Sequence, residues 1–265
     1  MDEILRKVGD TMPKKNEYIA VFDSGVGGIS VLRELMRLMP GENYLYFGDS
    51  ANAPYGSRPT EEIRRLAENV AEYLMGQGIK ALVVACNTAT SAAITALREK
   101  YPHMIVVGIE PALKPAADRF PGGTIGVLAT PVTLNEEKFQ QLVAHYGQRC
   151  TVVKLPAPGL SELVEHGKAD SAEAETLLRP LLAPWAGKLD ALVLGCTHYP
   201  FAAATIHRIL GEDIPLLDGG EGTARETKRR LEKAGLLNED AGLVVLENSA
   251  DDPNLLDLSH KLLED

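Results

Sequence analysis

Short apolar runs alternate along the chain with longer stretches in which apolar residues recur every three or four positions. Each run has about the length of a buried β-strand. The stretches between them have the period of an amphipathic helix, as in Ile29, Leu32, Leu35, Met36 and Met39. Buried strands that alternate with helices form right-handed βαβ units and parallel sheets, so the pattern predicts the α/β fold class.

The series of apolar runs occurs twice. The first series occupies residues 19–22, 44–47, 82–85 and 105–109, and the second occupies residues 125–128, 152–155, 192–195 and 214–217. Corresponding runs are about 108 residues apart, which is the length of a domain and much longer than a solenoid unit. We therefore expect two similar doubly wound parallel-sheet lobes related by a pseudo-two-fold axis, with the active site in the cleft between them.

A cysteine ends the third run of each series. Cys86 follows the sequence VVA, and Cys196 follows VLG. Ligands bind outside the carboxyl ends of parallel strands, so facing lobes would place the two thiols on opposite sides of one cleft. A helix N-terminus is expected after each cysteine, and its partial positive charge favours a thiolate. Acid–base groups on both faces of a carbon can remove a proton from one side and return one to the other, which inverts a stereocentre.

Other interpretations of these residues are weaker. A cysteine at the end of a buried strand often serves only as a small core side chain, and Cys150, which has no counterpart in the repeat, is assigned that role. A metal site made by Cys86, Cys196 and His198 would lack the usual ligand spacings, so no metal is expected. The glycine-rich turn at residues 23–28 matches neither a dinucleotide-binding loop nor a P-loop, and it predicts a tight strand-to-helix turn.

Composition narrows the class of protein further. Of the 265 residues, 45% are hydrophobic and 24% are charged, as in globular proteins. The net charge of −10 argues against nucleic acid or an anionic membrane as a partner and leaves a small molecule as the expected substrate. Three cysteines are too few for a disulfide framework, which favours a cytoplasmic protein. No apolar run has the ~18 residues of a membrane span, and residues 1–18 do not resemble a signal peptide.

Four motifs together resemble the glutamate racemases of the aspartate/glutamate racemase family. They are FDSGVGG at residues 22–28, GDSANAPYGSR at 48–58, VVACNTAT at 83–90 and LGCTHYP at 194–200. The similarity runs from about residue 19 to the end of the chain. It implies an isomerase that interconverts L-glutamate and D-glutamate without a cofactor and supplies D-glutamate for bacterial peptidoglycan.

The resemblance also implies a role for each matched residue. Cys86 and Cys196 would be the two acid–base catalysts, the first acting on D-glutamate and the second on L-glutamate. Asp23 would assist Cys86, whereas His198 and Glu165 would assist Cys196. Substrate contacts are implied for Asp23 and His198 and for six further residues, which are Ser24, Tyr55, Gly56, Asn87, Thr88 and Thr197.

The family arrangement implies how the lobes divide the chain. The first lobe would hold residues 1–101 and 205–265 and the second residues 102–204, so that the fourth strand of each half joins the opposite lobe. A homodimer is implied, and some members bind an activating cell-wall precursor through an extension such as residues 1–18. Asp218-Gly219-Gly220 departs from the usual Asp-Ser of the family, so no substrate contact is assigned there.

Two other functions stay open at this point. A racemase for aspartate or another amino acid would use the same pair of thiols, and a panel of amino acids would distinguish it. A binding or regulatory protein that has lost catalysis, like the family members that inhibit DNA gyrase, would keep the same fold. The intact Cys86, Cys196, Asp23 and His198 argue against this second alternative.

Overall fold

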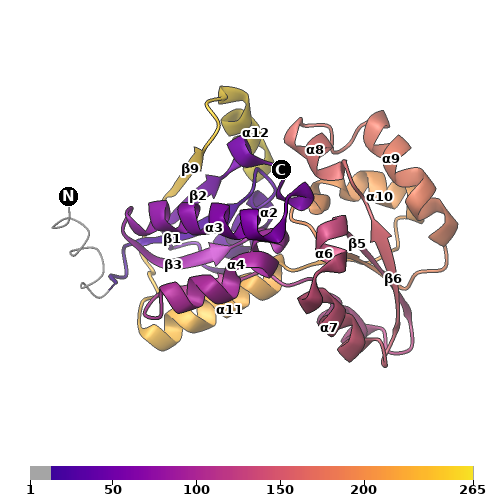
Figure 1. Cartoon of the computed structure of the whole chain (residues 1–265), viewed down its shortest axis with the longest axis horizontal. Coiled ribbons are helices and arrows are strands. Elements are labelled where there is room, and N and C mark those ends of the chain that lie inside the picture. The colour runs from indigo at the N-terminus through magenta and orange to yellow at the C-terminus, as the bar shows by residue number, and fades with distance from the viewer. Residues whose placement is uncertain (1–12, 265) are drawn as a thin grey trace.

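Two α/β lobes lie side by side in the computed structural model, which describes residues 13–264 (Figure 1). The first lobe contains a five-stranded sheet in the order β4-β3-β1-β2-β9, and all its strand pairs are parallel. The bounds are β1 (Tyr18–Asp23), β2 (Tyr44–Gly48), β3 (Ile79–Val84), β4 (Ile105–Gly108) and β9 (Val244–Asn248). The prediction of parallel sheets is confirmed for this lobe.

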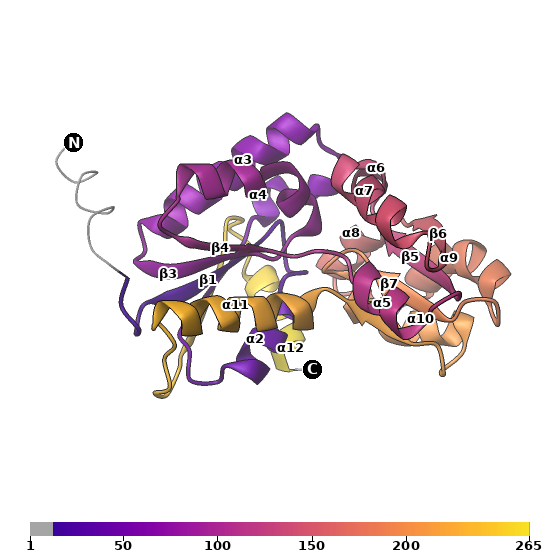
Figure 2. The same ribbon diagram turned by 90° about the horizontal axis from the view of Figure 1, so that it is seen from below.

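Helices cover both faces of the first sheet because each helix carries one apolar stripe. In Figure 2, α3 (Thr60–Met75) and α4 (Asn87–Lys100) lie on one face, and their buried residues pack with one side of β1 and β3. The other face is covered by α2 (Ile29–Leu38), α11 (Gly220–Ala234) and α12 (Pro253–Glu264). Strands with both faces covered are apolar throughout, which explains why they appear in the sequence as continuous runs.

The second lobe repeats the first four strands of this plan. Its parallel sheet has the order β6-β5-β7-β8, which matches β2-β1-β3-β4 of the first lobe. The bounds of the strands are β5 (Thr124–Ala129), β6 (Thr151–Pro156), β7 (Ala191–Leu194) and β8 (Leu216–Asp218). The duplicated α/β architecture predicted from the sequence is therefore confirmed.

Six helices cover the sheet of the second lobe. One face packs against α5 (Leu113–Arg119), α6 (Pro131–Asn135) and α7 (Glu137–Tyr146). The other face packs against α8 (Leu160–Glu165), α9 (Ala172–Leu182) and α10 (Ala203–Leu210). Residues 13–264 also contain four short 3₁₀ helices, namely η1 (Ser50–Asn52), η2 (Tyr55–Ser57), η3 (Ala183–Trp185) and η4 (Tyr199–Ala202).

The expected exchange of the fourth strands is wrong. β4 pairs with β3 and β8 pairs with β7, so each strand stays in the sheet of its own half. The expected lobes, residues 1–101 with 205–265 and residues 102–204, therefore assign both strands to the wrong sheet. The physical reason is that α4 packs directly on β3 and β4, and a right-handed βαβ crossover returns the chain to the same sheet.

The chain crosses between the lobes twice. The first crossing joins β4 to α5, and the second joins β8 to α11, which packs against α2 and β4 of the first lobe. After α11, β9 adds to the edge of the first sheet beside β2, and α12 packs against α2. Sequence analysis missed β9, because its run lies outside the repeat. None of the described helices is long and apolar enough to cross a membrane.

Candidate active site

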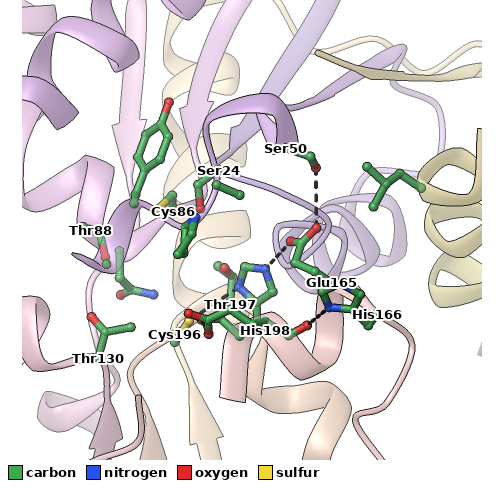
Figure 3. A pocket seen from close by; sticks show the side chains of 18 of the residues that line it. Ser24, Ser50, Cys86, Thr88, Thr130, Glu165, His166, Cys196, Thr197 and His198 are labelled. Atoms are coloured by element: carbon green, nitrogen blue, oxygen red, sulfur yellow. Dashed lines mark hydrogen bonds and ion pairs between the residues drawn. The ribbon is translucent and has the colours of Figure 1, made fainter. Parts of the chain in front are cut away.

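The loops that follow the strands of both sheets meet between the lobes and enclose a cavity of about 300 Å³. Cys86 from the first lobe and Cys196 from the second both line this cavity, as the sequence predicted (Figure 3). Ten of the eleven predicted site residues lie in its wall, and the exception is Asp23.

Cys86 lies at the N-terminus of α4 and caps that helix. The backbone N–H of Ala89 donates to Cys86 Sγ over 3.4 Å, and the thiol lies 3.6 Å from Ser24 Oγ. Burial and the nearby charge of Asp23 nevertheless raise the pKa of the Cys86 thiol to about 12. The expected lowering of this pKa by the helix is therefore wrong, because the N–H of Ala89 acts in that direction but burial outweighs it.

Cys196 lies beside a buried histidine–carboxylate pair. Cys196 Sγ is 3.6 Å from His198 Nδ1, and His198 Nε2 is 2.6 Å from Glu165 Oε1. Burial acts to lower the pKa of His198, but the hydrogen bonds to Cys196 and Glu165 outweigh it and raise that pKa well above its ordinary value. The shift favours the protonated form of His198, and a cation at this distance attracts a negatively charged sulfur.

Glu165 also joins the two lobes. It ends α8 in the second lobe, and its Oε1 accepts a hydrogen bond of 2.7 Å from the backbone N–H of Val26 in the first lobe. The turn before α2 has room for this carboxylate only because residue 25 is glycine. A Cβ atom on Gly25 would lie 1.8 Å from Glu165 Oε1, and one on Gly27 would lie 2.4 Å from His198 Nδ1. The glycine-rich turn thus receives the side chains of Glu165 and His198 from the opposite lobe.

Asp23 is fully buried beneath the cavity wall. Its Oδ2 accepts a hydrogen bond of 2.9 Å from Thr197 Oγ1 across the lobes, and its Oδ1 accepts one of 3.1 Å from the backbone N–H of Gly25. The carboxylate acts on Cys86 through its charge. Burial raises the pKa of Asp23 to about 6, although His198 and Thr197 act in the opposite direction.

The raised pKa of Asp23 predicts how stability depends on pH. The buried carboxyl prefers its neutral form, so its contribution to stability is present below the unfolded pKa and is lost as pH rises toward 6. Relative to Asp23→Asn, the free energy of unfolding of the native protein is expected to fall by about 2 kcal/mol between pH 4 and pH 7. Urea unfolding of both proteins at the two pH values measures this difference, and a difference that does not change with pH would contradict it.

The far side of the cavity carries uncharged polar groups. Thr88 and Thr130 lie opposite Glu165 and His198 in Figure 3. Asn87 Oδ1 is the buried side-chain atom without a hydrogen-bond partner among residues 13–264. Tyr55 donates its hydroxyl to Asp49 Oδ2 over 2.6 Å, which fixes the loop that carries Gly56. A buried acceptor without a partner is costly, so Asn87 is suited to receive a donor from a bound ligand.

Sequence analysis missed several residues of the wall. Thr130 follows β5 as Ser24 follows β1, so the repeat itself could have identified it. Three others belong to the motif at residues 48–58 but were not singled out, namely Ser50, Ala53 and Pro54. The rest lie outside the four motifs, namely Ser161, Glu162, His166, Asp252 and Leu255. No lysine or arginine is among the lining residues of the described chain. Within residues 13–264, no group of three or more His, Cys, Asp or Glu side chains is arranged to hold a metal ion.

Comparison with known proteins agrees with this geometry. Residues 25–227 match the family model for Asp/Glu/hydantoin racemases. A glutamate racemase from Clostridium botulinum is 48% identical over 256 residues, which cover 96% of this chain and 99% of the relative. A glutamate racemase from Clostridium acetobutylicum is 49% identical over 256 residues. The match covers 96% of this chain and 100% of the relative.

Solved structures give the same result. Glutamate racemase RacE1 from Bacillus anthracis superposes with a TM-score of 0.85 at 32% identity, covering 95% of each chain. The Escherichia coli enzyme, solved with L-glutamate and the activator UDP-MurNAc-Ala, has a TM-score of 0.79 at 32% identity and covers 95% of this chain and 93% of its own. The chain belongs to the Asp/Glu/hydantoin racemase family. The relatives described above are glutamate racemases, and the protein is an isomerase of the amino-acid racemase class.

Proposed function

We propose that the protein interconverts L-glutamate and D-glutamate by a two-base mechanism that uses Cys86 and Cys196. The observation that carries this proposal is the placement of one thiol from each lobe in the wall of a single cavity. A substrate bound between them would present opposite faces of its Cα to the two sulfur atoms. One thiolate removes the proton, and the opposite thiol returns one.

The two thiols lie in different surroundings, which suit one to act as the base and the other as the proton donor toward L-glutamate. The protonated form of His198 is favoured and its Nδ1 lies 3.6 Å from Cys196 Sγ, so a negative charge on this sulfur is stabilised and we assign Cys196 the role of base toward L-glutamate. Cys86, with its pKa raised to about 12, is suited to begin as the proton donor. Cys196 then takes the Cα proton of L-glutamate while Cys86 protonates the other face, which gives D-glutamate. The reverse reaction exchanges the roles, and no net proton or electron is consumed.

The carbanion formed at Cα needs stabilisation from the site. Backbone N–H groups at the start of α4 and hydroxyls such as those of Ser24 and Thr88 are available to the substrate carboxylates. The unpartnered Asn87 Oδ1 is suited to accept a hydrogen bond from the substrate ammonium group. The position of the cavity between the two lobes limits contact with water, which strengthens these interactions. No cofactor is assigned a role in the proposed reaction.

Glutamate is favoured as the substrate by the relatives. The Escherichia coli enzyme was solved with L-glutamate, and the Francisella tularensis enzyme, 27% identical with a TM-score of 0.81, was solved with D-glutamate. An aspartate racemase from Picrophilus torridus is only 16% identical, so it supports the shared fold alone.

A chiral assay of the purified protein tests the proposal. Either glutamate isomer, with no cofactor added, is expected to approach the same equal mixture of both isomers, because enantiomers have equal free energies. Aspartate and other amino acids serve as the panel and are expected to react more slowly. Unchanged optical rotation with glutamate, or faster turnover of aspartate, would overturn the assignment.

The wider role is part of the same proposal. The product D-glutamate would supply peptidoglycan synthesis in the cytoplasm, where free thiols such as Cys86, Cys150 and Cys196 stay reduced. A homodimer is proposed from the family resemblance. The Escherichia coli relative binds UDP-MurNAc-Ala, and a similar precursor is proposed as an activator here. The segment expected to take part, residues 1–18, lies largely outside the described residues.

A further inference from the structure

Two polar residues behind Glu165 have no part in the mechanism above. They are Ser50, which opens η1 after β2, and Asn248, which ends β9. Asn248 Nδ2 donates to Ser50 Oγ over 2.9 Å, and Ser50 Oγ lies 3.5 Å from Glu165 Oε2. In Figure 3, Ser50, Glu165 and His198 follow one another in a row toward Cys196. The C-terminal strand is thus connected to the second thiol by a chain of hydrogen bonds.

The direction of each hydrogen bond in this chain is determined. Asn248 Oδ1 accepts from the backbone N–H of Ala250 over 2.9 Å, so the other amide atom facing Ser50 is the nitrogen. An amide nitrogen can only donate, so Ser50 Oγ is the acceptor in that contact. The single hydroxyl proton of Ser50 is then free to point at Glu165 Oε2.

Glu165 uses its two oxygens differently. Oε1 accepts from Val26 N–H and contacts His198, whereas Oε2 faces Ser50. Only 13% of the Glu165 side chain is exposed, so water offers little replacement for a lost donor. Hydrogen bonds donated to both oxygens fix the rotation of a carboxylate about its terminal bond.

We propose that Ser50 positions Glu165 through its hydroxyl proton, and that Asn248, by donating to Ser50 Oγ, directs this proton toward the carboxylate. They orient its carboxylate so that Oε1 holds His198 beside Cys196. The proposal rests on the proposed function and deepens it, because it concerns the same site. It also explains why β9 adds to the first sheet at β2. That pairing sets Asn248 opposite Gly48, two residues before Ser50.

Substitutions that control the hydroxyl proton of Ser50 test this proposal. Ser50→Ala removes the donor, and Asn248→Asp replaces a donor with an acceptor, so the Ser50 proton turns away from Glu165. Both variants are expected to lower kcat for glutamate about tenfold with little change in KM. Asn248→Ala leaves the Ser50 proton free for Glu165 and is expected to have a much smaller effect, as is Ser50→Thr, which keeps the hydroxyl.

Ser249→Ala is the matched control. Ser249 lies next to Asn248 and accepts a hydrogen bond from Ala51 N–H, but it has no recorded contact with Glu165. Its activity is expected to equal that of the native protein. If Ser50→Ala fails to fold, the comparison of Asn248→Asp with Asn248→Ala still decides the question. Equal losses in those two variants, or an equal loss in Ser249→Ala, would overturn the proposal.

A spectroscopic measurement separates this proposal from the proposed function. The ring N–H of His198 that faces Glu165 is expected to give a downfield proton signal in nuclear magnetic resonance spectra, assigned by its absence in His198→Gln. The signal should shift in Ser50→Ala and Asn248→Asp and stay in place in Ser249→Ala. No shift in the first two variants would overturn the positioning role. A shift in a protein that does not racemise glutamate would support positioning while the proposed function fails.

Discussion

Cys86→Ala and Cys196→Ala are each expected to reduce racemisation of both glutamate isomers by at least about 10³-fold. In the proposed mechanism, each direction of the reaction needs one thiol to remove a proton and the other to return one. Loss of either sulfur therefore stops both directions. The double variant is expected to be no slower than either single variant, because the two groups act as a unit. A chiral assay started from each isomer measures these rates.

Cys150→Ala is the control for the cysteine variants. Cys150 is buried in the second lobe, where its thiol lies 3.5 Å from the carbonyl oxygen of Tyr146, and it does not line the cavity. This variant is expected to keep the native rate. Native-like racemisation by Cys86→Ala or Cys196→Ala would contradict the assignment of two bases.

Gly25→Ala is expected to lower kcat/KM by about 10²-fold, through misplacement of catalytic groups. The added Cβ would lie 1.8 Å from Glu165 Oε1, so the carboxylate must leave Val26 N–H and its position against His198. The lobes could then keep their contact only with the histidine–carboxylate pair displaced. The chiral assay measures the loss, and thermal unfolding shows whether the variant stays folded.

Gly222→Ala provides the matched control for this substitution. Gly222 lies within α11, and a Cβ atom there would meet no other atom within 4 Å. Alanine in a helix interior is expected to be neutral or slightly stabilising, and activity should not change. Full activity in Gly25→Ala would show that close contact between Glu165 and the glycine turn is not required.

The sequence predicted most of the fold because its strands are buried on both faces. Continuous apolar runs such as residues 82–85 and 192–195 mark such strands directly. The strand β9 was missed because it lies outside the repeat, at an edge of the sheet. The wrong expectation of exchanged strands came from the family resemblance, whereas strand pairing depends on how α4 packs on its own sheet.

Most of the site residues that lie in a sequence motif were predicted, whereas contacts that arise only when distant segments fold together were missed. Cys86 and Cys196 stand at equivalent positions of the repeat and could be paired from the sequence. The contact between Glu165 and Val26 joins residues 139 positions apart, and no spacing rule predicts it. The raised pKa of Cys86 was likewise not predictable, because burial depends on the assembled lobes.

Solvent deuterium incorporation tests the two-base account most directly. L-glutamate is incubated with the purified protein in D₂O, and the reaction is stopped after a small fraction has been converted. The D-glutamate formed is expected to carry deuterium at Cα, while the remaining L-glutamate keeps its proton. D-glutamate that retains the original proton, or L-glutamate that gains deuterium as fast as product forms, would contradict the account.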